Sequence, residues 1–449
     1  MDNPEQKQTP LETLREALEG GAMRPVRRMI GSLHPSEVAR LLESLPPAER
    51  AVVWELVDPD DEGDILVEVA DEVRTGLIER MDAQELIAAT EGMELDDLAD
   101  LVAGLPETVT RQVLRSLDKQ DRDRLREVLS YPEDSAGGLM NKDTITVRPD
   151  VTLEVVVRYL RVHGGMPDQT ESIFVVNRDD IFLGTLTLSR LLTNDPDLTV
   201  AEVMDTETKP IPAETSDTEV ARFFENRDLL SAAVVDIDNR LLGRITVDDV
   251  LDVIREEAEH SLMSRAGLDE EDDMFAPVVT SARRRAVWLG INLATAFLAA
   301  SVVDLFQGTV DAIVLLAVLM PVVPSMGGVA GTQSLTIITR AMALGQIDKS
   351  NARQILAKEV SVGILNGIGW ALVVAAVTVL WFGTWMVAAV IAAALTLNMI
   401  VAAVAGFVVP LTLKRLGVDP AIAGGVVLTT VTDVVGLMVF LGMGTLLLL

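Results

Sequence analysis

The 449-residue sequence contains no cysteine, so it can form neither a disulfide framework nor a thiolate metal site. Its only histidines are His34, His163 and His260, which argues against a multi-histidine zinc centre. The sequence shows no P-loop and no nucleophile–base constellation, so we do not expect an enzyme. Bases are scarce: 37 Lys and Arg against 68 Asp and Glu give a formal net charge of −31. Such an acidic excess disfavours nucleic-acid binding.

The charge is unevenly distributed along the chain. Residues 1–280 hold 28 bases and 62 acids, a net charge of −34, whereas residues 281–449 hold nine bases and six acids, a net charge of +3. The mean hydropathy of the whole chain is nevertheless +0.33. The sequence therefore predicts an acidic soluble half and a second half apolar enough to lie in a bilayer. The first 20 residues lack the apolar core of a signal peptide, so we expect the soluble half to be cytosolic.

The apolar half contains stretches long enough to cross a hydrocarbon core of about 30 Å as helices. We place five membrane spans at 286–306, 310–340, 357–381, 385–413 and 421–448. All nine bases of this half precede the first span or lie between the second and third or the fourth and fifth spans. The positive-inside rule then predicts a multi-pass protein of the cell membrane with a cytoplasmic N-terminus and an external C-terminus.

The soluble half divides into two regions of different periodicity. Short amphipathic helices separated by Pro, Gly and Asp predict an all-α, superhelical N-terminal domain over residues 1–131. Further on, Leu183–Leu188 (LGTLTL) recurs as Leu242–Val247 (LGRITV), each preceded by a helix, an apolar strand and a polar turn. This duplication resembles tandem α/β CBS domains, which we place at 137–200 and 201–255. A generic α/β duplication is the alternative.

An acidic segment follows the second copy, with eleven Asp and Glu from Asp248 to Asp273. Asp249, Asp252, Glu256 and Glu259 fall on one face of a helix, where like charges cost about 0.2–0.5 kcal/mol per pair unless cations neutralise them. We therefore expect an acidic connecting helix over 256–282 that senses divalent cations, with simple solvation as the alternative. For the stretch 269–273 we prefer a solvated linker.

Two features of the apolar half indicate an ion pathway. The second span contains Pro321, Pro324 and several glycines, which free backbone carbonyls and predict a pore-lining kink. The fifth span contains Asp433, roughly 18 Å into the core by helical rise, where a charge costs at least about 2.5 kcal/mol. No base lies at that depth, so a cation is the natural counter-charge. The candidate pore-lining residues are Gly328, Gly331, Thr332, Gln333, Thr429 and Thr430.

The motifs, in this order, resemble the MgtE family of magnesium channels and transporters over essentially the whole chain. They are Tyr131–Met140 (YPEDSAGGLM), Val247–Val253 (VDDVLDV), Gly327-Gly328 before Gly331–Ser334 (GTQS), Lys358-Glu359, Gly417–Pro420 (GVDP) and Thr430–Asp433 (TVTD). The resemblance implies a homodimer with a central Mg²⁺ pore, five spans per subunit and a cytosolic gate closed by bound Mg²⁺. It leaves open whether the CBS pair binds a nucleotide.

The resemblance also implies specific regulatory ligands. The positions that match the family's cytosolic Mg²⁺-sensing acids are Asp96, Asp100, Asp249, Asp252, Glu257 and Glu259. Asp419, in the loop before the fifth span, matches a metal-linked acid near the pore mouth.

The sequence departs from the family pattern at Val329, at Gly425-Val426 and at His260. The first two remove oxygen ligands or a kink from the pore, so a divalent-cation transporter of broader selectivity, one that passes Co²⁺, is an alternative. His260 weakens one sensing contact. Two rival functions are a membrane-anchored CBS sensor without transport and a CBS-regulated anion transporter. The intramembrane Asp433 argues against the first, and the lack of bases at depth argues against the second.

Overall fold

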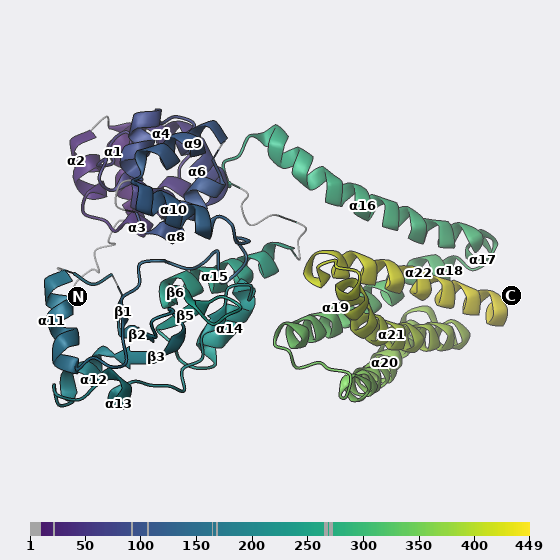
Figure 1. Cartoon of the computed structure of the whole chain (residues 1–449). Coiled ribbons are helices and arrows are strands. Elements are labelled where there is room, and N and C mark those ends of the chain that lie inside the picture. The colour runs from purple at the N-terminus through teal and green to yellow at the C-terminus, as the bar shows by residue number, and fades with distance from the viewer. Residues whose placement is uncertain are drawn as a thin grey trace, which may run out of the picture. The chain divides into compact units, whose positions relative to one another are not determined.

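A computed structural model of the chain describes residues 10–20, 23–90, 93–105, 107–163, 165–167, 169–264, 268 and 273–449. These residues form two compact units (Figure 1). The first unit contains the described residues up to Glu259 together with Asp273–Ala276. The second contains His260–Ser264, Leu268 and Pro277–Leu449.

The N-terminal part of the first unit consists of helices joined by turns, with no strand among its described residues, which confirms the all-α prediction. Side-chain caps start several of these short helices: Asp82 accepts from the backbone N–H groups of Gln84 and Glu85, and Glu85 bonds back to the backbone of Asp82. The helices are α1 (Pro10–Glu19), α2 (Met23–Ile30), α3 (Pro35–Glu43), α4 (Pro47–Trp54), α5 (Glu62–Glu68), α6 (Asp71–Ile78), α7 (Ala83–Ala89), α8 (Leu95–Ala103), α9 (Glu107–Ser116) and α10 (Lys119–Val128).

The duplicated region forms two three-stranded sheets of identical topology, which confirms the tandem CBS fold. In each sheet a short first strand pairs parallel to the second, and the second pairs antiparallel to the third. Phe174 and Phe182 of the first sheet share a small core with Ala233 and Val235 of the second. The elements are β1 (Thr146–Val147), α11 (Leu153–His163), β2 (Ser172–Val176), β3 (Phe182–Thr187), α12 (Leu188–Thr193), α13 (Val200–Val203), β4 (Ile211–Pro212), α14 (Asp217–Glu225), β5 (Ser231–Val235) and β6 (Leu241–Thr246).

The connecting helix differs from the range expected from the sequence. Helix α15 runs over Val247–Ser264, whereas a helix was expected over 256–282. It begins directly at the end of β6 because Asp249 accepts hydrogen bonds from the backbone N–H and the hydroxyl of Thr246, each at 3.0 Å. The described residues Asp273–Pro277 are not helical, so the connection to the membrane unit includes an irregular segment.

Asp273 corrects the expectation of a solvated linker. Its carboxylate receives two hydrogen bonds from the Arg50 guanidinium, at 2.9 and 3.1 Å, and each side chain is only 7% exposed. Arg50 also donates to the backbone carbonyls of Leu42 and Leu45, so its charge is held inside the helical domain. Asp269, Glu270, Glu271 and Asp272 lie outside the described residues.

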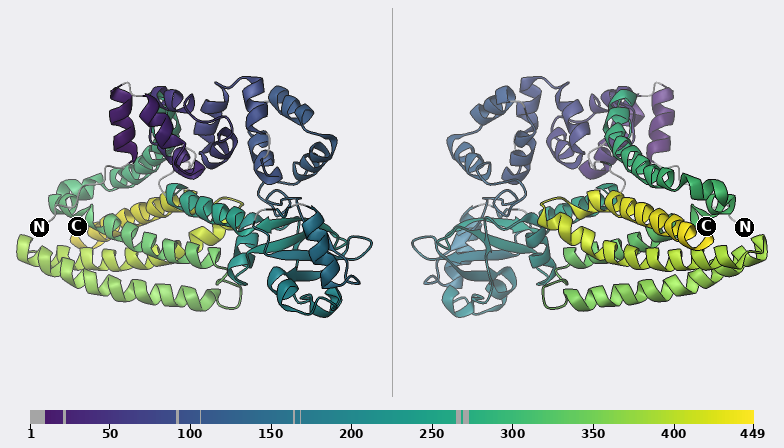
Figure 2. Two further views of the ribbon diagram at one scale, coloured as in Figure 1. Left: turned by 90° about the vertical axis from the view of Figure 1, so that its left-hand side faces the viewer. Right: turned by 90° about the vertical axis from the view of Figure 1, so that its right-hand side faces the viewer.

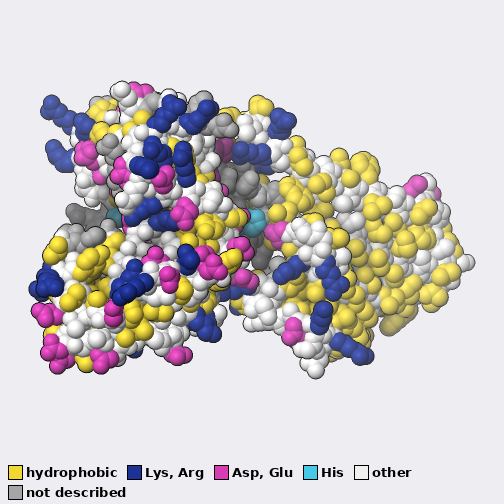
Figure 3. Space-filling view, viewed as in Figure 1, with side chains coloured by type: hydrophobic (Ala, Val, Ile, Leu, Met, Phe, Trp, Pro, Cys, Tyr) yellow, Lys and Arg dark blue, Asp and Glu magenta, His cyan; other side chains and the backbone are white. Residues whose placement is uncertain are grey.

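The second unit confirms the five predicted spans. Its helices are α16 (Val278–Leu305), α17 (Gln307–Ala312), α18 (Val314–Leu319), α19 (Val322–Ala343), α20 (Ala352–Phe382), α21 (Trp385–Arg415) and α22 (Pro420–Leu448). Five helical stretches are long and apolar enough to cross a membrane: α16, α18 with α19, α20, α21 and α22. Helices α19, α20, α21 and α22 lie side by side (Figure 2), and the visible face of this unit is largely hydrophobic (Figure 3).

The second span is broken, as its prolines predict. Helix α18 ends at Leu319 and α19 begins at Val322, with Pro321 between them. Proline has no N–H to give to a preceding carbonyl, so the helix cannot continue regularly through it. The predicted spans 286–306 and 310–340 leave residues 307–309 as a connection between them, whereas the structure has the short helix α17 there, before the second span.

Candidate ion pathway and acidic cluster

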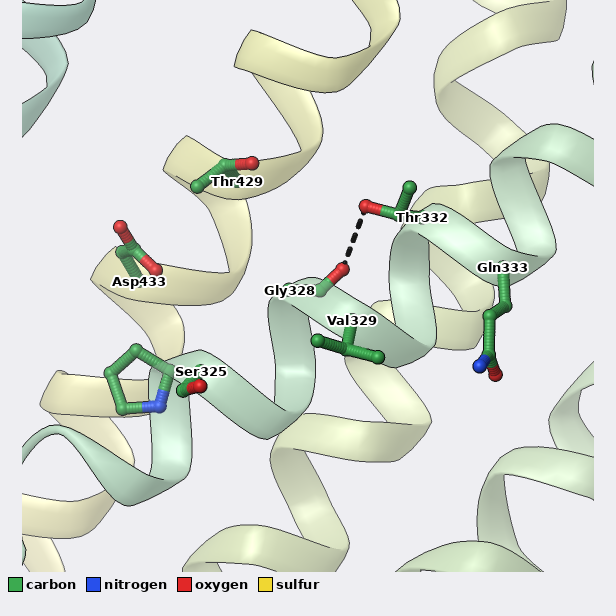
Figure 4. Close-up of a pocket in the computed structure, with 8 residues that line it drawn as sticks. Ser325, Gly328, Val329, Thr332, Gln333, Thr429 and Asp433 are labelled. Carbon is green, nitrogen blue, oxygen red and sulfur yellow. Dashed lines mark hydrogen bonds between the residues drawn. The ribbon is translucent and has the colours of Figure 1, made fainter.

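A hollow of about 450 Å³ opens between α19 and α22. We call it the Asp433 hollow. Asp433 and Thr429 project from α22, and the remaining lining comes from α19 (Figure 4). It is lined by Pro324, Ser325, Gly328, Val329, Thr332, Gln333, Thr429 and Asp433.

The surface of the hollow is mostly apolar, but it carries several side-chain oxygens around a single acid. The Thr332 hydroxyl donates to the Gly328 carbonyl at 2.8 Å, and the Thr429 hydroxyl donates to the Gly425 carbonyl at 2.9 Å. Each hydroxyl therefore donates its hydrogen bond within its own helix, and its oxygen lone pairs remain available to accept from another group. Among the described residues, Asp433 is the only ionisable side chain that lines the hollow, so the wall presents negative charge and acceptor oxygens, which suit a cation.

Five of the seven predicted pore residues line the hollow, and no described Lys or Arg does. They are Gly328, Thr332, Gln333, Thr429 and Asp433. The other two do not line the hollow. A Cβ on Gly331 would come within 2.9 Å of the Leu428 side chain, so this glycine allows α19 and α22 to pack closely. Thr430 is half-buried and bonds to the Val426 carbonyl at 2.7 Å.

Val329, one of the departures from the family pattern, lies in the lining and is 58% exposed. It presents methyl groups to the hollow at a position where an amide would offer an oxygen. Sequence reasoning missed Ser325, which also lines the hollow. Its position one residue after Pro324 was the available signal.

In the first unit, acids of α8 and α15 come together. We call Glu94, Asp96, Asp97, Asp248 and Asp249 the acidic cluster. The backbone amide of Asp97 donates to the Asp96 carboxylate at 3.1 Å, and the Asn141 amide donates to Asp96 at 3.3 Å and to Glu94. Asn141 follows the Tyr131–Met140 motif directly, but the sequence alone gave no sign that it would reach these acids.

Burial and mutual repulsion raise the pKa values of the cluster. Desolvation, followed by Asp249, Asp97 and Glu94, holds the pKa of Asp96 well above its usual range. Desolvation, with Glu94 and Asp248, raises the pKa of Asp97 to about 6. Desolvation also raises the pKa of Asp249 to about 7, although the hydrogen bonds from Thr246 oppose this. Ionising these groups together is therefore costly, and a bound divalent cation would remove that cost.

Asp100 and Asp252 lie at the edge of the cluster. The Asp100 side chain is exposed on α8, yet partial desolvation of its carboxyl, with Glu133 and Asp97, raises its pKa to about 7. Desolvation raises the pKa of Asp252 as well, and the Arg255 guanidinium, 3.2 Å away, opposes the shift. Asp252 thus already has a basic partner on its own helix.

Glu257 and Glu259 are exposed on α15. Asp419 belongs to the second unit, where it accepts from the backbone N–H of Ala421 at 2.8 Å and so caps α22. Its other oxygen lies 3.1 Å from Nε2 of His260, and the Ser264 hydroxyl lies 3.2 Å from the same nitrogen. The His260 departure therefore replaces an acid near Asp419 with a hydrogen-bonding partner.

One buried acid was quoted from the sequence only as part of a motif. Glu359 of α20 is 4% exposed, accepts from the Ser334 hydroxyl at 2.7 Å and lies 3.8 Å from the Lys358 amine. It therefore joins α20 to α19.

Within the described ranges, no three Asp, Glu or His side chains are close enough to form a ready-made metal cage. A hydrated cation that keeps most of its waters and takes few protein ligands fits both the Asp433 hollow and the acidic cluster best.

Comparison with known proteins decides the family. The family model of the MgtE intracellular N domain matches residues 33–134, the CBS model matches 136–197 and 200–256, and the MgtE model, described as a divalent cation transporter, matches 320–443. The magnesium transporter MgtE of Thermus thermophilus is 31% identical over 441 residues, which cover 97% of this chain and 98% of that protein. The chain belongs to the MgtE family.

Two further relatives support this assignment. The magnesium transporter MgtE of Bacillus subtilis is 28% identical, over 95% of each chain. A crystal structure of the cytosolic domain of the Mg²⁺ channel MgtE in complex with ATP matches with 32% identity and a TM-score of 0.50. It covers 54% of this chain and 99% of its own, as expected if the match is to the soluble half of this MgtE chain.

Proposed function

We propose that this MgtE chain is a Mg²⁺-permeable channel or transporter of the cell membrane that works as a homodimer and is closed by Mg²⁺ bound to its cytosolic acids. The observation that carries the proposal is Asp433, an intramembrane carboxylate on the wall of a hollow that also carries the hydroxyls of Ser325, Thr332 and Thr429. An acid at that depth is costly unless it serves an ion path.

The size of the hollow fits a hydrated ion. Mg²⁺ dehydrates reluctantly and commonly keeps several waters. Six waters at about 30 Å³ each occupy roughly 180 Å³, which is less than the hollow's volume of about 450 Å³. Asp433 would then attract the hydrated ion by charge, while the oxygens of Thr332 and Thr429 bind its waters.

The homodimer proposal has its support in the family and in the shape of the site. Two helices of one chain form the hollow, and a second copy facing it would complete a closed path. Because the chain has no cysteine, single-cysteine variants test this without background. Thr429→Cys should form an intersubunit disulfide under mild oxidation, whereas Leu380→Cys, which is 87% exposed on α20, should not.

The proposed orientation places the N-terminus and both soluble regions in the cytoplasm and the C-terminus outside. All nine bases of the apolar half lie near the helix ends assigned to the cytoplasmic side. They are in the first turns of α16, in the last turn of α19, between α19 and α20, in the first turns of α20 and in the last turn of α21. In intact cells, an impermeant thiol reagent should label Asp311→Cys and leave Lys349→Cys unlabelled. The reverse pattern would contradict this orientation.

We propose that regulatory Mg²⁺ binds to acids of the soluble half and of its connection to the membrane. The residues are Asp96, Asp100, Asp249, Asp252, Glu257, Glu259 and Asp419. The raised pKa values of Asp96, Asp97 and Asp249 support the inner part of this set, because they reflect negative charges held together without compensation. At high internal Mg²⁺ the ions would join α8 to α15 and close the gate; at low Mg²⁺ repulsion would separate them.

A nucleotide on the CBS pair is a further proposal, supported by the relative whose cytosolic domain was solved with ATP. Titration calorimetry of the detergent-solubilised chain with ATP, with and without Mg²⁺, tests it. Heat of binding that saturates at one nucleotide per CBS pair would support it, and no heat up to millimolar ATP would contradict it.

The deciding experiment for transport is flux into proteoliposomes, with Mg²⁺, Co²⁺, Mn²⁺ and Ca²⁺ compared. We expect Mg²⁺ to enter faster than in protein-free vesicles and to be blocked when Mg²⁺ is also present on the cytosolic side. Val329 supports a second candidate, a transporter of broader selectivity, because it gives the hollow an apolar wall. Co²⁺ flux equal to Mg²⁺ flux would favour that alternative, and no divalent flux would favour a sensor without transport.

A further inference from the structure

Asn398, in the middle of α21, is completely buried, with 0% of the residue exposed. Its side-chain Nδ2 donates to the backbone carbonyl of Val323 on α19 at 2.9 Å. Its Oδ1 has no hydrogen-bond partner among the described residues. The side chain therefore links two helices through one directional bond and leaves a buried polar atom unsatisfied.

Two glycines make room for this amide. A Cβ on Gly327 of α19 would lie 2.2 Å from Asn398 Nδ2, and a Cβ on Gly436 of α22 would lie 2.7 Å from the same atom. Both distances are shorter than atoms tolerate, so any larger residue at either position must displace the amide. Asn398 thus fills the point where α19, α21 and α22 meet.

Stability alone does not explain an amide at this point. A buried acceptor without a partner costs free energy, and an apolar side chain of similar shape would avoid that cost. Helix packing in a bilayer needs close approach, which the two glycines already provide. What Asn398 adds is the bond to Val323, which fixes where this turn of α19 lies against α21.

The residues that Asn398 holds are immediate neighbours of the residues that line the hollow. Val323 and Gly327 precede Pro324 and Gly328, which face the hollow, and Gly436 lies about one helical turn after Asp433. A shift of α19 against α21 would therefore move the Gly328 carbonyl and the Thr332 hydroxyl relative to Asp433.

We propose that Asn398 is a positioning residue for ion transport: its bond to Val323 and its contact with Gly327 and Gly436 set the distance across the Asp433 hollow. Selectivity among divalent cations depends on that distance, because the oxygens of the wall must match the hydrated ion. This inference rests on the proposed transport function.

The test compares Asn398→Leu with the unmodified chain in proteoliposomes. Leu has a similar branched shape but cannot donate to Val323. We expect a stable dimer with an unchanged or higher melting temperature, and a ratio of Mg²⁺ to Ca²⁺ flux lowered by about fivefold or more, because the wall oxygens no longer hold their spacing. Thr378→Val is the matched control: Thr378 is 1% exposed, and its hydroxyl donates to the Val374 carbonyl of its own helix and to no other helix that the structure describes. Its selectivity should be unchanged.

A second pair of variants tests the contact with glycine. Gly327→Ala should impair flux because its new methyl group displaces the Asn398 amide. In the double variant Gly327→Ala, Asn398→Ala the amide is gone, so the effect of the alanine should be largely relieved, and the two effects will not add. Equal impairment by Gly327→Ala with and without Asn398, or wild-type selectivity in Asn398→Leu, would overturn the proposal.

These outcomes are separable from the transport function itself. If the unmodified chain transports no divalent cation, the transport proposal fails. The position of α19 relative to α22 can then still be measured by a distance between spin labels. Spin labels at Val329→Cys and Thr429→Cys, diluted with unlabelled subunits, report the distance across the hollow. Asn398→Leu should shift or broaden that distance, and Thr378→Val should not. An unchanged distance in Asn398→Leu would overturn the positioning role on its own.

Discussion

The Asp433 hollow and the acidic cluster use the same carboxylate chemistry in different settings. The hollow has one acid among hydroxyls and is open. The cluster has five acids, partly buried, whose mutual repulsion and desolvation raise several of their pKa values. A site through which an ion passes must release it, so one fixed charge suffices. A site that holds two domains together gains strength from several charges, because divalent affinity increases with ligand charge.

The largest effect should come from the hollow. Asp433→Asn keeps the size of the side chain and removes its charge, so we expect Mg²⁺ flux to fall at least about tenfold, equal to roughly 1.4 kcal/mol of lost ion stabilisation. If Mg²⁺ joins α8 to α15, it should protect the first unit against protease, and this protection should be unaffected by the substitution. Flux assays and limited proteolysis of the same preparation measure both. Undiminished flux in a correctly assembled variant would remove Asp433 from the ion path.

Substitutions in the acidic cluster should have the opposite outcome: they should preserve Mg²⁺ transport and weaken its inhibition by Mg²⁺. Asp96→Asn with Asp249→Asn takes two charges from the acidic cluster, and we expect the Mg²⁺ concentration that half-closes the pore to rise by about tenfold. Maximal flux should stay the same. Glu257→Gln with Glu259→Gln is the matched pair: both are exposed on α15, so a smaller shift is expected. If the exposed pair has the larger effect, sensing is centred there and not in the buried cluster.

The pH dependence should also separate the two sites. The folded-state pKa values of Asp97, about 6, and Asp249, about 7, lie above the usual Asp value. Protons therefore compete with Mg²⁺, and inhibition should need up to about tenfold less Mg²⁺ for each proton displaced as pH rises from about 6 to about 8. Without Mg²⁺ the sign is opposite: the contribution of these two carboxyls to the stability of the first unit is fully present below about pH 4 and is lost as pH rises through about 6 to 7. Thermal melts with and without Mg²⁺ measure this, and parallel curves would contradict it.

The smallest effect is expected at Val329. Val329→Asn returns an amide oxygen to the wall of the hollow and should raise discrimination for Mg²⁺ over Co²⁺ by about threefold, with little change in Mg²⁺ flux. Competition flux with both ions measures the ratio. Val362→Asn, on the exposed surface of α20, controls for a polar residue elsewhere. The same ratio in all three chains would show that position 329 does not contact the ion or its waters.

Features set by local periodicity were predictable from the sequence. The apolar strand predicted ahead of the first repeat is present as β2 (Ser172–Val176), and the five spans appear where apolar length places them. Asp433 stood out because an acid in an apolar run has few alternatives to an ion path. These features depend on neighbours within one helix or one hairpin.

Features set by contacts between distant segments were not predictable. Asp273 sits in an acidic run typical of a linker, but Arg50, more than 200 residues earlier, binds it inside the helical domain. Asn141 reaches acids of α8, and Asn398 reaches Val323, with no local pattern to show either contact. Gly331 looked like a pore residue, yet its missing side chain serves the packing of Leu428.

The Arg50–Asp273 ion pair also sets a length. Asp273 lies five residues before Val278, where α16 begins, and five residues of fully extended chain reach at most roughly 17 Å. While the ion pair is intact, the first residue of α16 can lie no farther than this distance from Asp273. Residues 273–278 are therefore a short tether. Any larger movement of the helical domain relative to α16 must either break the buried ion pair or displace α16.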